Sequence, residues 1–86
     1  MNTNNLFNKK TIFQTKYRAM VRQMVEIRKS RGLTQRDLAD KLKVPHCYIG
    51  RAETFERRLD IIEMVKWLKA LNLTNDEIID FLKQAL

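Results

Sequence analysis

The sequence predicts an all-α domain of five helices, and three observations lead to that prediction. Two Gly and one Pro in 86 residues are too few for a chain of short strands and turns. Residues with high helix propensity, such as Leu, Lys, Arg and Glu, are abundant. Apolar residues recur at steps of three and four positions along most of the chain. A chain of this length holds one domain with one modest core.

The first residues differ in character from the rest. Residues 1–11 are polar and rich in Asn, with Lys9 and Lys10 near their end. Polar chain ends are usually poorly ordered unless something ties them down. We therefore predict a flexible basic N-terminal arm over residues 1–11 and a single folded domain over residues 12–86.

The longest helix is predicted from about residue 12 to residue 31. Tyr17, Met20 and Met24 recur at steps of three and four residues, so that they share one stripe of the helix. Arg31-Gly32 ends it, with a cation in the last turn and Gly just beyond. We expect this helix to serve mainly as scaffold.

Residues 34–53 read as two short helices joined by a tight turn. Thr34 and Asp37 have the spacing of a capping box, which marks the start of the first helix. Val44-Pro45 ends that helix, because the proline ring disfavours helical geometry in the residue before it and suits the opening of a new helix. The two helices are predicted over about 34–42 and about 45–53.

The second of these helices has an inward and an outward side. Tyr48, Ile49 and Ala52 are predicted to lie inward. The outward set consists of His46, Cys47, Gly50 and Arg51. Two short helices joined by a turn of three or four residues form a helix-turn-helix, whose second helix enters the DNA major groove. Similar pairs also occur in small helical domains that never touch DNA, so the pattern alone leaves both interpretations open.

Two more helices are predicted in residues 60–86. Each begins with a capping box, formed by Asp60 with Glu63 and by Thr74 with Glu77. The core positions expected in the first of them are Ile61, Ile62, Val65, Leu68 and Leu71. The last helix is more apolar than a terminal helix in water needs to be, so we expect part of it to cover the core and the remainder, with Trp67, to contact a second copy. The predicted dimer surface consists of Trp67, Ile78, Phe81, Leu82 and Ala85.

The net charge of +7 is unevenly spread. Residues 1–36 carry +8, residues 37–59 carry +1 and residues 60–86 carry −2. This layout is expected when one face meets phosphates and another does not, although a solvated basic surface would look the same. The arm over residues 1–11 would then either reach around DNA or remain an untethered terminus.

The chain resembles the lambda-repressor/Cro (XRE-type) helix-turn-helix family from Arg28 to Leu71, about half of its length. The matching residues are Arg28, Arg31-Gly32-Leu33-Thr34-Gln35, Asp37-Leu38-Ala39, Leu42, Val44, Tyr48-Ile49, Glu53 and Glu56-Arg57-Arg58-Leu59-Asp60. The resemblance implies a five-helix lambda-repressor-like domain. It also implies that Arg28 lies near Glu53 and ties the end of the recognition helix to the first helix.

The resemblance assigns contacts on both sides of the turn. Gln35 is expected to touch a phosphate and to brace the start of the recognition helix, and its neighbour Arg36 to touch a phosphate. Arg57 and Arg58 are expected to contact phosphates, because this loop flanks the groove in the family. Phe55 departs from the family, which usually has Gly there. A left-handed Phe would cost ~1–2 kcal/mol, and otherwise the loop takes another path.

The recognition helix supplies the expected base contacts. His46 and Cys47 open it, where base edges are read. Arg51 is the best candidate for a bidentate contact with guanine, and a phosphate contact is the alternative. The Tyr48 hydroxyl is expected to reach the DNA backbone. Gly50, where the family commonly has Ser, either lets the helix lie closer to the groove or is simply tolerated.

Other chemistries find little support in the sequence. One His and one Cys provide no catalytic set and no metal site, and we expect no cofactor. No apolar run approaches the ~20 residues that span a membrane, and a single Cys fits a reducing compartment. We therefore expect a cytoplasmic protein that is not an enzyme.

These observations predict a sequence-specific DNA-binding transcriptional regulator. It is expected to act as a dimeric repressor that reads an inverted repeat of double-stranded DNA through the major groove. One alternative is an antitoxin or restriction-controller-type autoregulator with a cognate toxin or other protein partner. Another is a helical protein–protein adaptor that does not bind DNA.

Overall fold

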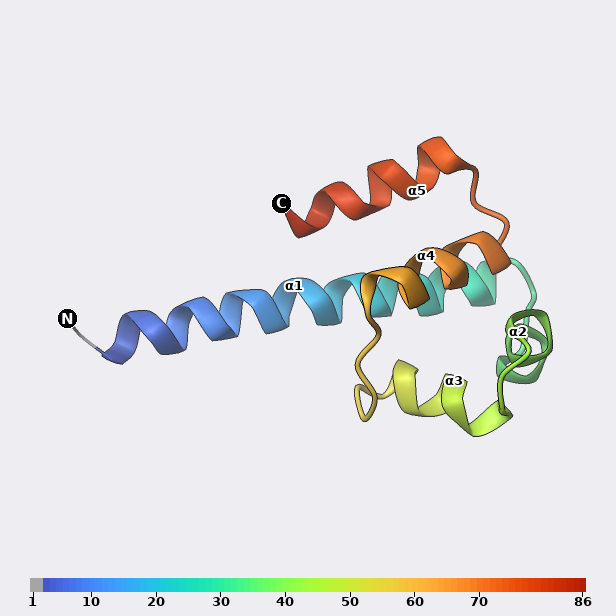
Figure 1. The fold of residues 1–86 in the computed structure, drawn as a ribbon, viewed down its shortest axis with the longest axis horizontal. Coiled ribbons are helices and arrows are strands. Elements are labelled where there is room, and N and C mark those ends of the chain that lie inside the picture. The colour runs from blue at the N-terminus through green and yellow to red at the C-terminus, as the bar shows by residue number, and fades with distance from the viewer. Residues whose placement is uncertain (1–2) are drawn as a thin grey trace.

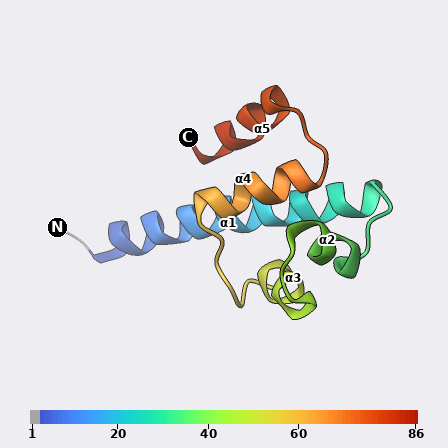
Figure 2. The ribbon, with the colours of Figure 1, turned by 45° about the vertical axis from the view of Figure 1, so that its right-hand side comes forward.

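A computed structural model describes the backbone of residues 3–86 and the side chains of residues 14–86. Its elements are α1 (Thr3–Ser30), α2 (Gln35–Leu42), α3 (His46–Glu53), α4 (Ile61–Ala70), α5 (Asn75–Leu82) and a final 3-10 turn, η1 (Lys83–Ala85). Figure 1 shows the long α1 running through the molecule with α4 beside it. The helices α2 and α3 lie on one side of this pair and α5 on the other, in both Figure 1 and Figure 2. Within residues 3–86 the fold is all-α, as predicted.

Helix α1 begins earlier than the sequence predicted. It runs from Thr3, whereas a flexible arm was expected over residues 1–11. Residues 1 and 2 lie outside the described part of the chain. The stretch from Thr3 to Ser30 holds neither Pro nor Gly, so that nothing in it removes a helical hydrogen bond or adds backbone freedom. The polar composition that indicated an arm is therefore compatible with a helix of 28 residues.

The core lies where α1, α2, α3, α4 and α5 meet. Its least exposed large side chains are Met24, Leu38, Ile49, Trp67, Leu68 and Leu71. Ile61 and Ile62 were expected in this core but are 58% and 62% exposed. They occupy the first turn of α4, off the stripe through which Met64, Trp67, Leu68 and Leu71 face inward at helical spacing.

The predicted dimer surface also needs correction. Trp67, Ile78 and Phe81 are 2%, 4% and 8% exposed, so they belong to the core of the single chain. The reason is that α5 packs on α4 and η1 packs on α1, which uses the apolar face of α5 within one molecule. Leu82 is half-buried and Ala85 is exposed, so these two positions remain available to a second copy.

All three predicted capping boxes are present. The Thr34 hydroxyl accepts the N–H of Asp37, the Asp60 carboxylate accepts that of Glu63, and the Thr74 hydroxyl accepts that of Glu77. The acidic residue of each box accepts the cap N–H in return. The hydrogen bonds with Thr34 and Thr74 hold the pKa values of the Asp37 and Glu77 carboxyls below their ordinary values.

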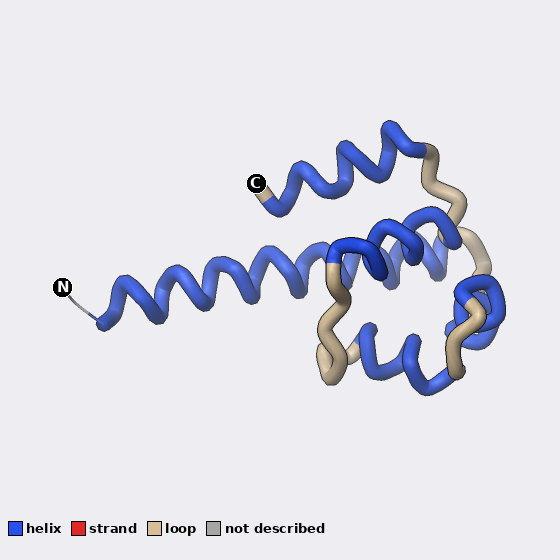
Figure 3. The backbone as a smooth tube through the Cα atoms, in the orientation of Figure 1, coloured by secondary structure: helices blue, strands red, loops and turns tan. Residues whose placement is uncertain are grey.

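Helices α1 to α4 are each followed by a residue in the left-handed region, which starts the short connections drawn in tan in Figure 3. These residues are Gly32, Lys43, Phe55 and Asn72, with φ of 70°, 57°, 68° and 69°. The next N–H then reaches back to a carbonyl in the last turn of the helix, as in a Schellman motif. These bonds run from Leu33 to Arg28, from Val44 to Ala39, from Glu56 to Arg51 and from Leu73 to Leu68, at 2.9–3.2 Å.

Candidate nucleic-acid interface

The connection between α2 and α3 is short and fixed by its residue types. Lys43 takes the left-handed conformation after α2, and Pro45 is the N-cap of α3 with φ −59° and ψ 145°. Proline is restricted to this φ, and its ring carries no hydrogen-bond acceptor, so α3 begins at His46 without a side-chain cap. The structure thus holds two short helices joined through residues 43–45, within one residue of the predicted bounds.

Helix α3 presents the predicted faces. Ile49 and Ala52 are fully buried, which anchors one side of α3 in the core. His46, Cys47 and Arg51 are exposed on the other side, and Tyr48 and Gly50 are partly buried between the two. Cys47 carries a free thiol. The side chains predicted to read bases therefore share one accessible face.

A buried ion pair fixes the end of α3. Arg28 Nε donates to Glu53 Oε2 at 2.7 Å and Arg28 Nη2 donates to Oε1 at 3.0 Å, while Nη1 donates to the Leu33 carbonyl at 2.7 Å. The side chains of Arg28 and Glu53 are each only 8% exposed. The predicted pairing is therefore present as a bidentate contact, and it is shielded from the solvent that weakens surface pairs.

Gln35 joins this network from the first turn of α2. Its Nε2 donates to Glu53 Oε1 at 2.9 Å, so that α1, α2 and α3 meet at one carboxylate. Its Oε1 would lie 3.7 Å from a Cβ built on Gly50, which is ordinary van der Waals contact. Gln35 therefore braces the end of α3, whereas the resemblance implied a brace at its start, and the phosphate contact of Gln35 stays a prediction.

A second cluster gathers around Glu63, a residue that the sequence analysis did not single out for the site. Glu63 Oε2 accepts the Tyr48 hydroxyl at 2.7 Å and Arg57 Nη2 at 2.8 Å. The N–H of Asp60, together with these two donors, lowers the pKa of the Glu63 carboxyl from 4.5 to about 2. Burial, followed by the hydrogen bond to Glu63, raises the pKa of Tyr48.

This cluster gives Tyr48 an internal partner that was not predicted, and its contact with DNA stays a prediction. Its hydroxyl was predicted to reach DNA, whereas in the structure it donates to Glu63 and so ties α3 to α4. The only sequence signal for Glu63 was its place in the capping box with Asp60. Arg57 lies over the Tyr48 ring at 4.7 Å and remains 48% exposed, so its guanidinium has both an internal partner and an open side.

The loop after α3 brings arginines together with aromatic rings. Arg58 lies 4.4 Å over the ring of Tyr17. Phe55 keeps the left-handed conformation of the family's usual Gly, with φ 68°, and Arg18 and Arg22 of α1 lie 4.9 and 5.4 Å from its ring centroid. Sequence reasoning missed Arg18 and Arg22 as site residues. The sequence held two signals for them: Arg18 and Arg22 are four residues apart on one helix, and Phe55 stands where the family usually has Gly.

The remaining cations of this face are unpaired. Arg36, at the start of α2, and Arg51 are exposed and have no carboxylate within ion-pair distance among the side chains of residues 14–86. In the same part of the chain, no three His, Cys, Asp or Glu side chains come close enough to hold a metal ion. The face formed by α2, α3 and the loop of residues 54–60 therefore offers several cations to an anionic partner.

Comparison with known proteins agrees with this geometry. A family model described as helix-turn-helix matches residues 24–78, well over half of the chain. No curated protein and no solved structure matches the chain. Among the described residues, no helix has the length and apolar character needed to cross a membrane.

Proposed function

The chain belongs to the lambda-repressor/Cro-like helix-turn-helix family of DNA-binding regulators, and from this premise we propose that it acts in the cytoplasm as a dimeric repressor. In this proposal α3 enters the major groove of an operator. The observation that carries this proposal is the arrangement of α3. Its outer face is exposed, and its last residue, Glu53, is fixed by the buried ion pair with Arg28.

The proposed base contacts come from the outer face of α3. His46 and Cys47 lie in its first turn, and Arg51 follows one turn later on the same side. The guanidinium of Arg51 can donate two parallel hydrogen bonds to guanine O6 and N7. A rigid helix makes this contact specific, because the side chain does not have to be positioned by the DNA.

The proposed phosphate contacts flank these residues. Gln35 and Arg36 lie in the first turn of α2, where the helix N-terminus itself favours an anion. Arg57 and Arg58 lie in the loop that follows α3. Contacts on both sides of the recognition helix fix its register on the duplex.

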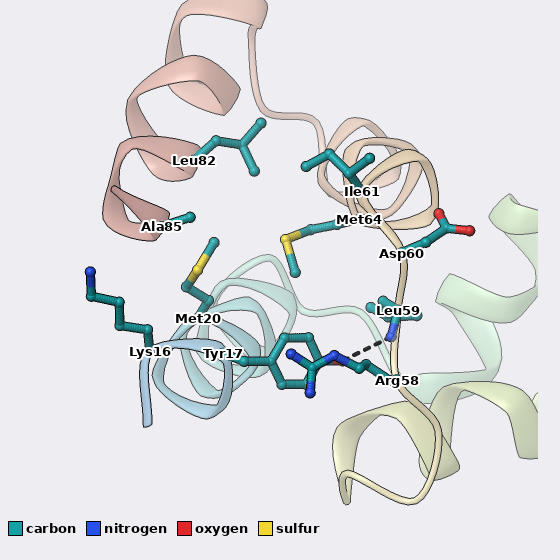
Figure 4. Close-up of a pocket in the computed structure, with 10 residues that line it drawn as sticks. All are labelled: Lys16, Tyr17, Met20, Arg58, Leu59, Asp60, Ile61, Met64, Leu82 and Ala85. Atoms are coloured by element: carbon teal, nitrogen blue, oxygen red, sulfur yellow. Dashed lines mark hydrogen bonds between the residues drawn. The ribbon is translucent and has the colours of Figure 1, made fainter. Parts of the chain in front are cut away.

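A second copy is proposed to pack against α5 and η1. A groove of about 370 Å³ lies there between α1, α4 and the end of α5, as Figure 4 shows. Met20, Ile61, Met64, Leu82 and Ala85 give it an apolar lining. Leu86, just beyond the groove, is 95% exposed, which extends the apolar surface toward the chain end. Two copies would present their α3 helices to half-sites ~34–36 Å apart.

The test is selection from a randomised duplex library, with binding of the selected pools measured at several salt concentrations. A dimeric repressor is expected to enrich an inverted repeat and to lose affinity steeply as salt rises. Enrichment of a single half-site would contradict the dimer. Absence of binding at low salt would refute DNA as the ligand of this face and favour a protein-binding adaptor.

Arg51→Ala tests the assignment of the base contact. The loss of a bidentate contact is expected to cost ~1–3 kcal/mol of binding free energy and to relax preference at one base position. The matched control is Lys69→Ala, which removes an exposed cation from the last turn of α4, outside the helix-turn-helix and outside the proposed dimer contact. A uniform loss on all sequences would instead assign Arg51 to a phosphate.

A further inference from the structure

A cluster of arginines and aromatic rings lies beside the loop that follows α3, outside the helix-turn-helix itself. It consists of Arg18 and Arg22 on α1, Phe55 and Arg58 in the loop, and Tyr17 between them. We propose that this cluster is a second phosphate-binding surface, through which α1 grips the DNA backbone beside the operator groove. The inference rests on the proposed function and adds α1 to the elements that contact DNA.

The conformation of Phe55 is the first observation that supports the proposal. A non-Gly residue in the left-handed region costs ~1–2 kcal/mol, and such strain persists only where the surroundings fix it. Gly would take the same φ of 68° without strain, as Gly32 does at the end of α1. The ring of Phe55 makes contacts that Gly could not make.

The second observation is that the ring contacts two arginines of α1. The guanidinium carbons of Arg18 and Arg22 lie 4.9 and 5.4 Å from its centroid, within the range of cation–π attraction. Both arginines are exposed, and neither has a carboxylate within ion-pair distance among the described side chains. The stack restricts two long side chains without neutralising them, which lowers the entropy they lose when an anion binds.

The shape of the surface agrees with an anion of phosphate size. A hollow of about 180 Å³ is lined by Gln14, Tyr17, Arg18, Phe55 and Arg58. Arg18 enters it from α1 and Arg58 from the loop, so that cations from two elements converge on one space. Guanidinium groups suit phosphate because their planar fork donates two parallel hydrogen bonds.

The position of the cluster relative to α3 makes the DNA backbone the favoured occupant. Phe55 follows the last residue of α3 by two positions, and Arg57 and Arg58 continue the same loop. A groove-bound α3 would therefore bring a phosphate strand past this loop, and α1 would extend the contact along that strand. The extra contacts would strengthen binding to every sequence equally, since phosphates carry no sequence information.

The experiment compares Arg18→Gln and Arg22→Gln with Lys69→Gln in the full chain, on the selected operator and on a 30-base-pair duplex of mixed sequence. Each phosphate contact contributes about 0.9 to the slope of log affinity against log salt. Each arginine variant is expected to lower that slope by about 0.9 and to weaken binding roughly five- to tenfold at 0.1 M salt on both duplexes. Lys69→Gln removes the same charge from α4, outside every proposed contact, and is expected to leave the slope unchanged.

Phe55→Leu and Phe55→Tyr test the ring. Both keep a side chain in the left-handed position, but only Tyr keeps the aromatic face. Phe55→Leu is expected to weaken DNA binding about two- to fivefold, the equivalent of an exposed cation–π contact, and Phe55→Tyr to leave it unchanged. Thermal unfolding of both variants shows whether a loss of binding follows a loss of structure.

Two outcomes separate this proposal from the one it rests on. If the unaltered protein enriches an operator and the arginine variants match Lys69→Gln in salt slope, the second phosphate surface is refuted and the repressor stands. If stability falls in the arginine variants while the slope stays constant, the cluster serves only to hold the loop. If the unaltered protein binds no DNA, both proposals fail together.

Discussion

At the scale of single residues, Gly50 is a position where a methyl group is expected to raise the stability of the fold. Gly in a helix interior costs ~1 kcal/mol relative to Ala, and Gly50 has a helical conformation with no steric need for Gly. A Cβ there would meet only Gln35 Oε1, at 3.7 Å. Gly50 is therefore either tolerated there or placed for close approach to the groove, and the two explanations predict different effects on DNA binding.

Gly50→Ala is therefore expected to raise the free energy of unfolding by ~0.5–1 kcal/mol. Urea denaturation measures this change. Gly32→Ala is the matched control of opposite sign, because Gly32 has φ 70° and Ala there is expected to cost ~1–2 kcal/mol. A loss of stability in Gly50→Ala would show that Gln35 cannot accommodate the methyl group. Weaker operator binding in the stabilised variant would assign Gly50 to the DNA contact.

Single residues also show where prediction from sequence ends. The Arg28–Glu53 pair could be predicted because both residues match the family, and the structure contains it. The stack of Arg18 and Arg22 on Phe55 joins residues more than thirty positions apart that carry no shared motif. Only the packing of the loop against α1 reveals it.

At the scale of elements, Glu63 connects α3, α4 and the loop between them. It accepts hydrogen bonds from Asp60, Tyr48 and Arg57, and these hold its pKa at about 2. Since the pKa in the unfolded chain is near 4.5, the folded state binds fewer protons between these values. The stabilisation is complete above about pH 4.5 and is lost as the pH falls toward 2.

Glu63→Gln is accordingly expected to lower stability at neutral pH and to flatten the fall in stability between pH 5 and pH 2. Thermal melts across this range measure both effects. Glu26→Gln is the control, because Glu26 is an exposed carboxylate on α1 without a hydrogen-bond partner among the described side chains. If the stability of Glu63→Gln fell as steeply between pH 5 and pH 2 as that of the unaltered protein, this pH dependence would not come from Glu63. Asp37 and Glu77, whose pKa values are also lowered, are expected to supply the remaining dependence.

The helix boundaries show which elements the sequence encodes locally. Thr34, Asp60 and Thr74 mark the starts of α2, α4 and α5, since a cap needs only residues three positions apart. The start of α1 at Thr3 was missed because residues 3–11 carry no stop signal and no clear start signal. The exposure of Ile61 and Ile62 was missed because a run of apolar residues does not show which of them face the core.

At the scale of the whole molecule, α5 and η1 form the side opposite to α3, as Figures 1 and 2 show. The sequence analysis assigned this side to a dimer contact, but Ile78 and Phe81 serve the core of the single chain. The amount of apolar surface was evident from the sequence. Its division between core and interface was not, because that depends on how α5 packs on α4.

Ala85→Glu tests the revised dimer surface. Ala85 lines the groove and is exposed, so the substitution adds charge to the proposed contact without altering the core. The expected result is dissociation to monomers in sedimentation equilibrium and weaker binding to an inverted repeat. Asn75→Glu adds the same charge in the first turn of α5, where a helix favours it, and is expected to stay dimeric. A dimeric Ala85→Glu variant would place the interface elsewhere.

The brace behind α3 also bears on how new DNA specificities can arise in this fold. Arg28, Gln35 and Glu53 hold the helix from its inner side, while His46, Cys47 and Arg51 have no side-chain partner among the described residues. Exposed positions of this kind usually accept substitution within about 0.5 kcal/mol of stability. The outer face of α3 is therefore free to diverge among descendants of this sequence. Such changes would alter which operator is recognised and leave the scaffold the same.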